Sequence, residues 1–181
     1  MISGNTGSDL AAAQISQWIQ TCSDSHERCQ GASEPQILPS RVLEILASRT
    51  VRLKITSENE VAQYTTLSYA WGKTTFIRTT SLTLLDHQNN IPWDALPKTF
   101  QDAVQVTLRL GLKYIWIDSL CIVQDDDGDW RKEGSRMASI YSRSFLTIAA
   151  TKSSNPKGGC FVISSPGCVG RTYELLSLIH I

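Results

Sequence analysis

No stretch of this sequence approaches the roughly 18 consecutive apolar residues that a transmembrane helix needs. The first residues, MISGNTGSDLAAAQ, lack the basic region and apolar core of a secretory signal. The 17 basic and 17 acidic residues cancel, so charge gives no reason to expect nucleic acid or an anionic membrane as a partner. We therefore expect a cytoplasmic protein that binds neither.

The common nucleotide-binding and hydrolase motifs are also missing. The sequence contains no G-x-G-x-x-G, no Walker A loop and no G-x-S-x-G. Its three histidines stand in no context that suggests pairing with a nucleophilic cysteine. The five cysteines are an odd number without a secretory signal, which favours reduced thiols over a disulfide framework.

Hydrophobic residues make up 41% of the 181 residues, enough for the core of one domain. We expect a disordered or partly helical N-terminus (1–17), an extension with a helix, a loop and a small β element (18–60), an α/β core (61–160) and an irregular tail (161–181). Because the tail stops in the apolar run LIHI, it looks truncated.

The N-terminal extension should hold one helix and an antiparallel β element. Asp9 can cap a helix from about Leu10 to Thr21. Further on, TVRLKIT alternates apolar and polar residues as a half-exposed strand does, and RVLEIL precedes it as a pairing partner.

The core sequence alternates strands and helices. Strands are expected in YTTLSYAWG, KYIWIDSLCIV and FLTIAAT. A helix over 96–111 has Pro97 in its first turn and Gly111 at its C-cap, and a second helix is capped by Asp129. This order predicts an α/β fold with a mostly parallel sheet and helices on both faces. Ligands of such sheets bind where the strands end.

Several polar and aromatic residues fall at these strand ends. Asp118 must be paired, hydrogen-bonded or at the end of the strand, because burying an unpaired carboxylate is very unfavourable. It is either a cap that accepts backbone N–H groups or a group that faces a ligand. The other candidate ligand-binding residues at this edge are Ser68, Tyr69, Trp71, Gly72, Cys121 and Gln124.

Two stretches suggest metal ligands but do not meet the templates. QDDDGDW fails the calcium-loop pattern, and a solvated turn that leads into a helix cap is expected instead. CSDSHERC places Cys22, His26 and Cys29 within eight residues, but a structural zinc site needs four ligands. We therefore expect packing cysteines here and no metal.

Glu133 follows Asp129 on the second helix. An acid near a helix start is favoured by the dipole or by an ion pair one turn away. The functional alternative is a general acid/base or a carboxylate that binds ribose hydroxyls.

The order and spacing of these stretches resemble the fungal heterokaryon-incompatibility (HET) domain. The resemblance rests on LPSRVLEI, YTTLSYAWG and the long stretch from LPKTFQDAV to FLTIAA, and WIQTCSDSHERC is similar to the segment that often precedes the domain. Gly134 departs from the pattern, and a full domain normally continues beyond GGCF.

The resemblance implies a fungal signalling protein that acts in non-self recognition and triggers programmed cell death through protein partners and self-association. HET domains are distantly similar to Toll/interleukin-receptor (TIR) domains, which implies a flavodoxin-like sheet and, by analogy, NAD as a substrate. Glu133 and Asp118 would then be the catalytic carboxylates, and no cofactor is needed. The alternatives are a non-enzymatic oligomerisation module and an inactive truncated fragment.

Overall fold

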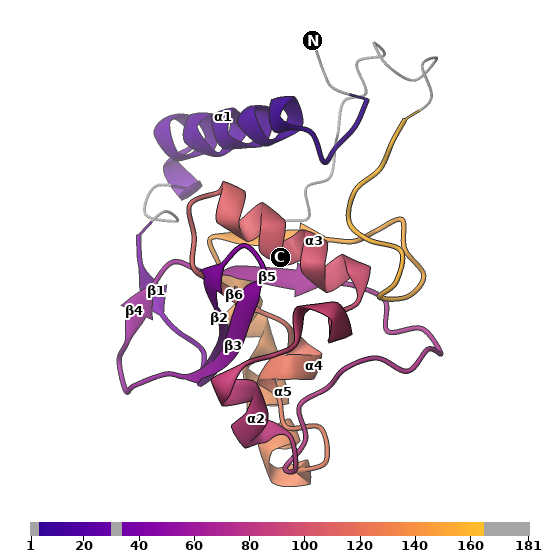
Figure 1. Cartoon of the computed structure of the whole chain (residues 1–181). Coiled ribbons are helices and arrows are strands. Elements are labelled where there is room, and N and C mark those ends of the chain that lie inside the picture. Colours follow the sequence, from indigo (N-terminus) through magenta and orange to yellow (C-terminus); the bar gives the residue numbers. More distant parts are fainter. Residues whose placement is uncertain (1–3, 30–33, 165–181) are drawn as a thin grey trace.

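The computed structural model describes residues 4–29 and 34–164. Its centre is a five-stranded sheet in the order β3-β2-β6-β5-β7, accompanied by a two-stranded sheet of β1 and β4 (Figure 1). The strands are β1 (Gln36–Ile37), β2 (Arg41–Ala47), β3 (Thr50–Ile55), β4 (Val61–Ala62), β5 (Thr65–Ser68), β6 (Tyr114–Trp116) and β7 (Leu146–Ala149). The helices are α1 (Asp9–Ser25), η1 (Glu27–Cys29), α2 (Leu84–Asn89), η2 (Trp93–Ala95), α3 (Lys98–Arg109), α4 (Asp118–Cys121) and α5 (Asp127–Ser142).

The predicted α/β class is confirmed, but the sheet is mixed and only part of it is parallel. β5 pairs parallel with β6 and with β7, whereas β2 pairs antiparallel with β3 and with β6. The expected antiparallel pair of β2 and β3 is therefore present, and it forms one side of the main sheet. A short turn joins β2 to β3, so this side needs no crossover helix and its strands run in opposite directions.

Helices cover both faces of the sheet, as expected. The hydroxyl of Tyr64 donates to the Ile140 carbonyl of α5, whereas the Thr65 hydroxyl lies 2.7 Å from the Thr107 hydroxyl of α3. Because successive side chains of a strand point to opposite faces, α3 and α5 lie on opposite sides of the sheet. Both strand-to-helix contacts are buried.

The C-terminal end of α3 follows the sequence prediction, whereas Pro97 is the N-cap and not part of the first turn. Pro97 precedes the first helical residue, and Gly111 has a φ of +76° just beyond the last turn. The N–H of Gly111 donates to the Leu108 carbonyl and that of Leu112 to the Thr107 carbonyl. This pair of bonds is the Schellman arrangement, which glycine favours because it tolerates a positive φ.

The start of α5 differs from the prediction. Asp126, not Asp129, is the N-cap, and its side chain accepts from the N–H groups of Gly128 and Asp129. Asp129 lies in the first turn, and its carboxylate pairs with Arg41 and accepts from the Val123 N–H. Several acids in a row can each act as an N-cap, so residue type alone does not predict which of them caps the helix.

The β6 region is shorter than the apolar run suggested. β6 ends at Trp116, and a single helical turn, α4, begins at Asp118. The polar connection after Gly72 holds the short helix α2 and an isolated β-bridge from Ile91 to Val51.

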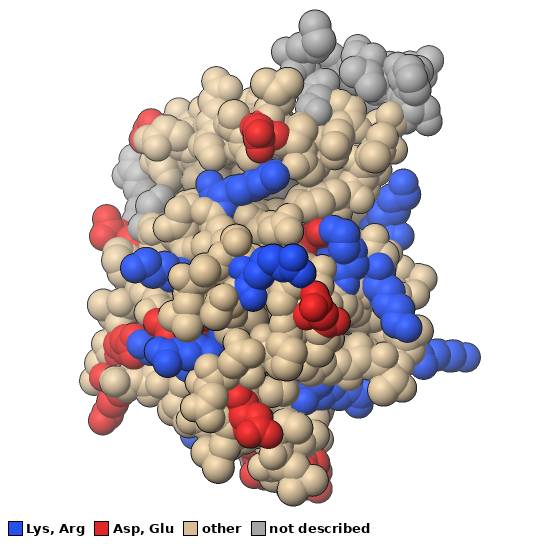
Figure 2. Space-filling view, viewed as in Figure 1, with Lys and Arg blue, Asp and Glu red and all other residues tan. Residues whose placement is uncertain are grey.

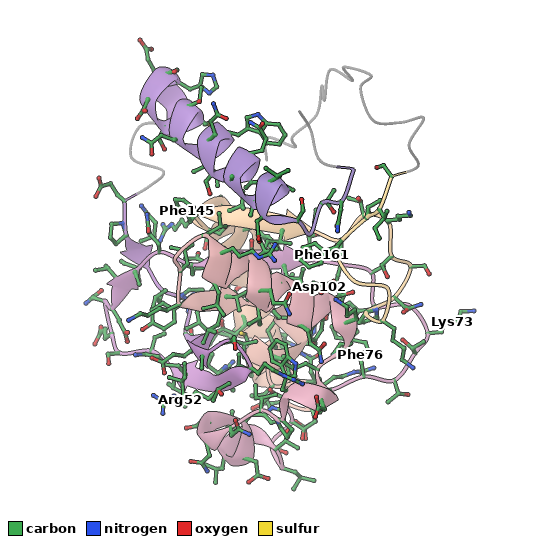
Figure 3. The ribbon with its side chains drawn as sticks, turned by 45° about the horizontal axis from the view of Figure 1, so that its top comes forward. Arg52, Lys73, Phe76, Asp102, Phe145 and Phe161 are labelled. Atoms are coloured by element: carbon green, nitrogen blue, oxygen red, sulfur yellow. The ribbon has the colours of Figure 1, made fainter. Side chains whose placement is uncertain are left out.

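α3 also holds the segment that follows β7. The Thr99 N–H donates to the Pro156 carbonyl, and the N–H of Cys160 donates to Asp102 Oδ2 at 3.0 Å. Figure 3 shows Asp102 and Phe161 where this segment passes α3. Asp102 is a buried carboxylate that the sequence analysis did not single out, although it lies among the apolar positions of the helix.

α1 packs loosely at one end of the molecule. None of its residues is buried, and it lies apart from the sheet in Figure 1. Ser8 is its N-cap in place of the expected Asp9, and the helix continues to Ser25. The preceding turn pairs with the far end of the described chain through the Asn5–Ile163 bridge. None of the described helices is long and apolar enough to cross a membrane.

Candidate functional site

Asp118 lies at the edge where the parallel strands β5 and β6 end. The Tyr69 hydroxyl donates to Asp118 Oδ1 at 2.8 Å, and the Trp71 indole Nε1–H donates to Oδ2 at 2.8 Å. Oδ1 also accepts from the backbone N–H of Ser119 at 2.7 Å. Asp118 is thus the first residue of α4, after its N-cap Ile117, and the partner of two aromatic side chains from the neighbouring strand end.

Burial governs the electrostatics of this group. Removal from water raises the pKa of the Asp118 carboxyl, and the hydrogen bonds from Tyr69, Trp71 and the Ser119 N–H offset this effect only in part. Burial, together with the nearby Asp118 carboxylate, raises the pKa of the Tyr69 hydroxyl far above its usual range. Tyr69 therefore remains a hydrogen-bond donor at every physiological pH.

Aromatic packing fixes the two donors. The Tyr69 ring meets Phe100 edge-on at a centroid distance of 5.0 Å, and Trp71 meets Phe76 edge-on at 5.4 Å. Arg78 lies over the Trp71 ring at 5.1 Å from its centroid, a favourable contact between a cation and an aromatic face. These contacts leave the Tyr69 and Trp71 polar atoms directed at Asp118.

The neighbouring predicted residues hold the backbone of this edge. Ser68 is exposed, and its carbonyl accepts from the Ala150 N–H after β7. Gly72 has a φ of +59°, and a Cβ there would lie 2.8 Å from the Ser154 carbonyl oxygen. Gln124 donates its side-chain N–H groups to the carbonyls of Asp118 and Ile122.

Cys121 is a buried core residue. Burial raises the pKa of its thiol to about 12, so the thiol is protonated at neutral pH. Its backbone carbonyl accepts from Arg41 Nε at 2.6 Å. These features suit a packing residue and not a nucleophile.

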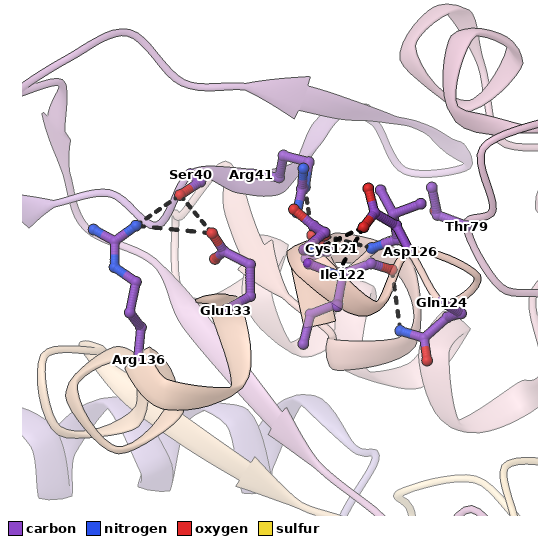
Figure 4. Close-up of polar contacts among 12 residues, drawn as sticks. Ser40, Arg41, Thr79, Cys121, Ile122, Gln124, Asp126, Glu133 and Arg136 are labelled. Atoms are coloured by element: carbon purple, nitrogen blue, oxygen red, sulfur yellow. Dashed lines mark hydrogen bonds and ion pairs between the residues drawn. The ribbon is translucent and has the colours of Figure 1, made fainter. Parts of the chain in front are cut away.

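Glu133 belongs to a second cluster, on α5 against the start of β2. Its side chain is 2% exposed, and Oε1 accepts from the Ser40 hydroxyl at 2.9 Å. Arg136, one turn later, pairs with Oε1 at 3.8 Å and donates to the Ser40 hydroxyl at 2.8 Å (Figure 4). Glu133 and Asp118 share no hydrogen-bond partner, so the two candidate catalytic carboxylates lie in separate networks.

Arg41 and Asp129 form the third polar contact of this region, which the sequence analysis did not connect. Arg41 Nη2 lies 2.5 Å from Asp129 Oδ2, which also accepts from the Val123 N–H. Burial works to raise the pKa of Asp129, but the hydrogen bonds from Arg41 and Val123 outweigh it and hold the pKa below its ordinary value. An arginine at the start of a strand gives no sequence signal of a partner 88 residues away.

Neither Asp118 nor Glu133 lines the two hollows described between α1 and α3 and along the segment after β7. The second of these, of about 340 Å³, lies between Lys152 and Ile163, beyond the edge that carries Gly72. In the described part of the chain, the buried hydroxyls of Ser119 and Thr74 have no hydrogen-bond partner. The Ser119 hydroxyl lies next to Asp118, and its proximity to the Tyr69 hydroxyl acts to lower the pKa of Tyr69.

The structure brings Cys22, His26 and Cys29 together at the end of α1. Their sulfur and nitrogen atoms all lie within 4.8 Å of one another. The sequence spacing alone does not predict that Cys29 lies beside Cys22 and His26, because Cys29 lies beyond the end of α1.

The charged side chains do not mark a binding surface of one sign. On the face in Figure 2, acidic and basic side chains are interspersed over most of the surface, with more basic ones toward its right edge. Net charge would therefore not direct recognition on most of this face.

The comparisons with known proteins support the resemblance stated from the sequence. The model of the heterokaryon incompatibility protein (HET) family matches residues 64–172, more than half of the 181-residue chain. The matched region includes the Tyr69–Trp71–Asp118 network and Glu133. Comparison with curated proteins and with solved structures gives no match. The chain therefore belongs to the heterokaryon incompatibility family.

Proposed function

We propose that this chain acts in heterokaryon incompatibility as a non-enzymatic signalling module. In a fungal cell it would trigger programmed cell death after fusion with a non-self partner, through protein partners and self-association. The observation that supports the proposal is that both candidate catalytic carboxylates, Asp118 and Glu133, are bound by other groups of the protein. Asp118 accepts from Tyr69, Trp71 and the Ser119 N–H, and Glu133 is held by Ser40 and Arg136.

A carboxylate that transfers protons or stabilises a cationic centre must reach the substrate. Glu133 is 2% exposed and contacts the Ser40 hydroxyl and the Arg136 guanidinium. The two carboxylates also lie in separate networks, whereas cleavage of a glycosidic bond normally uses two acids on opposite sides of one substrate. These facts support a role in which the acids hold the fold and the surface carries the signal.

Expression of the chain in a fungal host tests this proposal. We expect growth arrest without loss of cellular NAD. Glu133→Gln keeps the acceptor for the Ser40 hydroxyl, so this variant should fold and should still arrest growth. Glu58→Gln, on the exposed turn after β3, is the matched control. Growth arrest lost in Glu133→Gln but kept in Glu58→Gln, with both chains folded by circular dichroism, would contradict the module.

A second candidate is TIR-like NAD cleavage at the strand edge. The observation that favours it is the Ser119 hydroxyl, buried without a partner beside Asp118 and the Tyr69–Trp71 pair. An aromatic face and polar groups at the ends of parallel strands suit a nucleotide. In this case Asp118 would bind ribose hydroxyls, and purified protein would release nicotinamide from NAD.

The two candidates differ in one measurement. Purified wild-type chain incubated with NAD should release no nicotinamide if the module proposal holds. If the wild type releases nicotinamide and both Asp118→Asn and Glu133→Gln do not, the enzyme proposal replaces the module proposal. Sedimentation over a range of concentrations then tests self-association separately from catalysis.

A further inference from the structure

Three side chains with metal-ligating atoms converge where α1 ends. Cys22 Sγ and Cys29 Sγ are 3.1 Å apart, and His26 Nδ1 is 3.4 Å from Cys22 Sγ. The two cysteines are half-buried and His26 is exposed, so the cluster is open to solvent on one side. The cluster lies outside the Asp118 and Glu133 networks.

Local backbone geometry produces this convergence. Cys22 and His26 are four residues apart and therefore share one face of the helix end. The His26 N–H donates to the Cys22 carbonyl, which completes the last helical turn. The Cys29 N–H then donates to the His26 carbonyl at 2.9 Å, so the turn η1 folds Cys29 back onto the same face.

The donor set selects the class of metal. Two thiols and one imidazole are soft or borderline ligands, which suit zinc and not magnesium or calcium. Zinc binds sulfur at about 2.3 Å and nitrogen at about 2.0–2.1 Å. In a tetrahedron these lengths place two sulfurs about 3.8 Å apart and a sulfur and a nitrogen about 3.6 Å apart. The observed separations are within about 0.7 Å of both values.

We propose that Cys22, His26 and Cys29 bind one zinc ion, with water in the fourth position. Sites with three protein ligands and water are an established zinc geometry. This inference revises the expectation of packing cysteines, because the sequence alone did not place Cys29 beside the other two. It is independent of the proposed signalling function.

A disulfide between Cys22 and Cys29 is the chemical alternative. It accounts for the approach of the two sulfurs, which would close from 3.1 Å to about 2.05 Å. It does not account for His26 Nδ1, which lies 3.4 Å from Cys22 Sγ. A metal accounts for the approach of all three side chains, and binding it requires the two sulfurs to separate by about 0.7 Å.

The metal would stabilise a segment that packing leaves weak. α1 contains no buried residue, so little hydrophobic burial fixes its C-terminal end. Zinc would join the last turn of α1 to η1. Because binding energy at such a site is also local folding energy, zinc should protect this turn from opening.

Metal content and cobalt spectroscopy test the proposal on the full chain. The protein purified under reducing conditions should carry one zinc per chain. After removal by a chelator, Co²⁺ should restore a spectrum with thiolate-to-cobalt charge transfer and tetrahedral d–d bands. Added Zn²⁺ should displace the cobalt and slow hydrogen exchange at the His26 and Cys29 amides.

Variants assign the ligands. Cys22→Ser, Cys29→Ser and His26→Ala should each weaken Zn²⁺ binding by more than about 100-fold. Mutating even the hydrogen-bond partners of metal ligands lowers metal affinity about 10–100-fold. Cys160→Ser is the matched control, because this thiol contacts the Thr99 carbonyl and lies outside the cluster. No zinc in the wild type, a cobalt spectrum without thiolate bands, equal loss in Cys160→Ser, or a Cys22–Cys29 disulfide under reducing conditions would overturn the assignment.

Discussion

At the scale of single residues, Asp118 shows how one buried carboxylate organises a strand edge. It accepts from two side chains that follow β5 and from a backbone N–H of its own helix α4, so it joins the ends of β5 and β6. All three described partners are donors. The group at this position must therefore present acceptors on both sides, which a carboxylate does and an amide does not.

Asp118→Asn tests this requirement. The amide can accept from Tyr69 and Ser119 through its oxygen, but its NH₂ group then faces the Trp71 N–H. We expect the free energy of unfolding to fall by about 1–3 kcal/mol, the usual effect of a buried donor left unpaired. Urea unfolding followed by circular dichroism measures the loss.

A double-mutant cycle separates this conflict from other effects. Trp71→Phe removes the indole N–H, so adding Asp118→Asn to Trp71→Phe should cost less than it does in the wild type. Additive losses would show that the Trp71–Asp118 hydrogen bond is not the reason for the acid at position 118.

The Arg41–Asp129 pair predicts a dependence of stability on pH. The folded state holds the pKa of Asp129 below its unfolded value of about 3.9, so the pair contributes fully above that pH. Its contribution is lost as the pH falls through the folded-state pKa. Asp129→Asn should lower the free energy of unfolding by about 1.5–3 kcal/mol at pH 7, and the difference should shrink below about pH 4.

Asp94→Asn is the matched control for that experiment. Asp94 also pairs with an arginine, Arg49, but the two side chains are 90% and 65% exposed. Exposed pairs contribute little, so this variant should stay within about 0.5 kcal/mol of the wild type. If both variants lose the same free energy of unfolding at pH 7, burial does not explain the contribution of the Arg41–Asp129 pair.

At the scale of elements, local patterns in the sequence predicted most helices and strands but not their partners. The apolar stripe and terminal residues of α3, and the alternation in β3, are local signals that the structure confirms. Pairing of β2 with β6 joins Leu43 to Ile115, and no local pattern encodes such a distant choice. The same holds for the candidate site: residue types placed Asp118 at a strand end, but its bonds to Tyr69 and Trp71 follow only from the sheet order.

The start of α5 offers a test at this scale. Asp126 accepts from two N–H groups that otherwise have no helical partner, so Asp126→Ala should cost about 1 kcal/mol. Asp126→Asn keeps the accepting oxygen and should restore most of this stability, because Asn and Asp cap about equally well. Thermal unfolding of both variants decides whether capping, rather than charge, fixes this helix end.

At the scale of the whole molecule, stability is unevenly distributed. β2, β5 and β6 carry many of the fully buried side chains, and α3 and α5 cover them from opposite faces. α1 is attached at its start, where Arg109 donates to the Gly7 carbonyl at 2.6 Å. Such an arrangement separates a cooperative core from an outer helix that can open alone.

Hydrogen exchange without added zinc tests this separation. Amides of α1 should exchange at least about 100-fold faster than those of β5 and β6, because opening a helix with no buried residue exposes little apolar surface. Low concentrations of denaturant should accelerate exchange in the strands and leave α1 almost unchanged, since the denaturant effect scales with the surface exposed. Arg109→Ala should speed exchange in the first turn of α1 and not in the sheet. If α1 and the strands instead respond to denaturant with the same slope, the helix unfolds together with the core, and its exposed side chains do not report its stability.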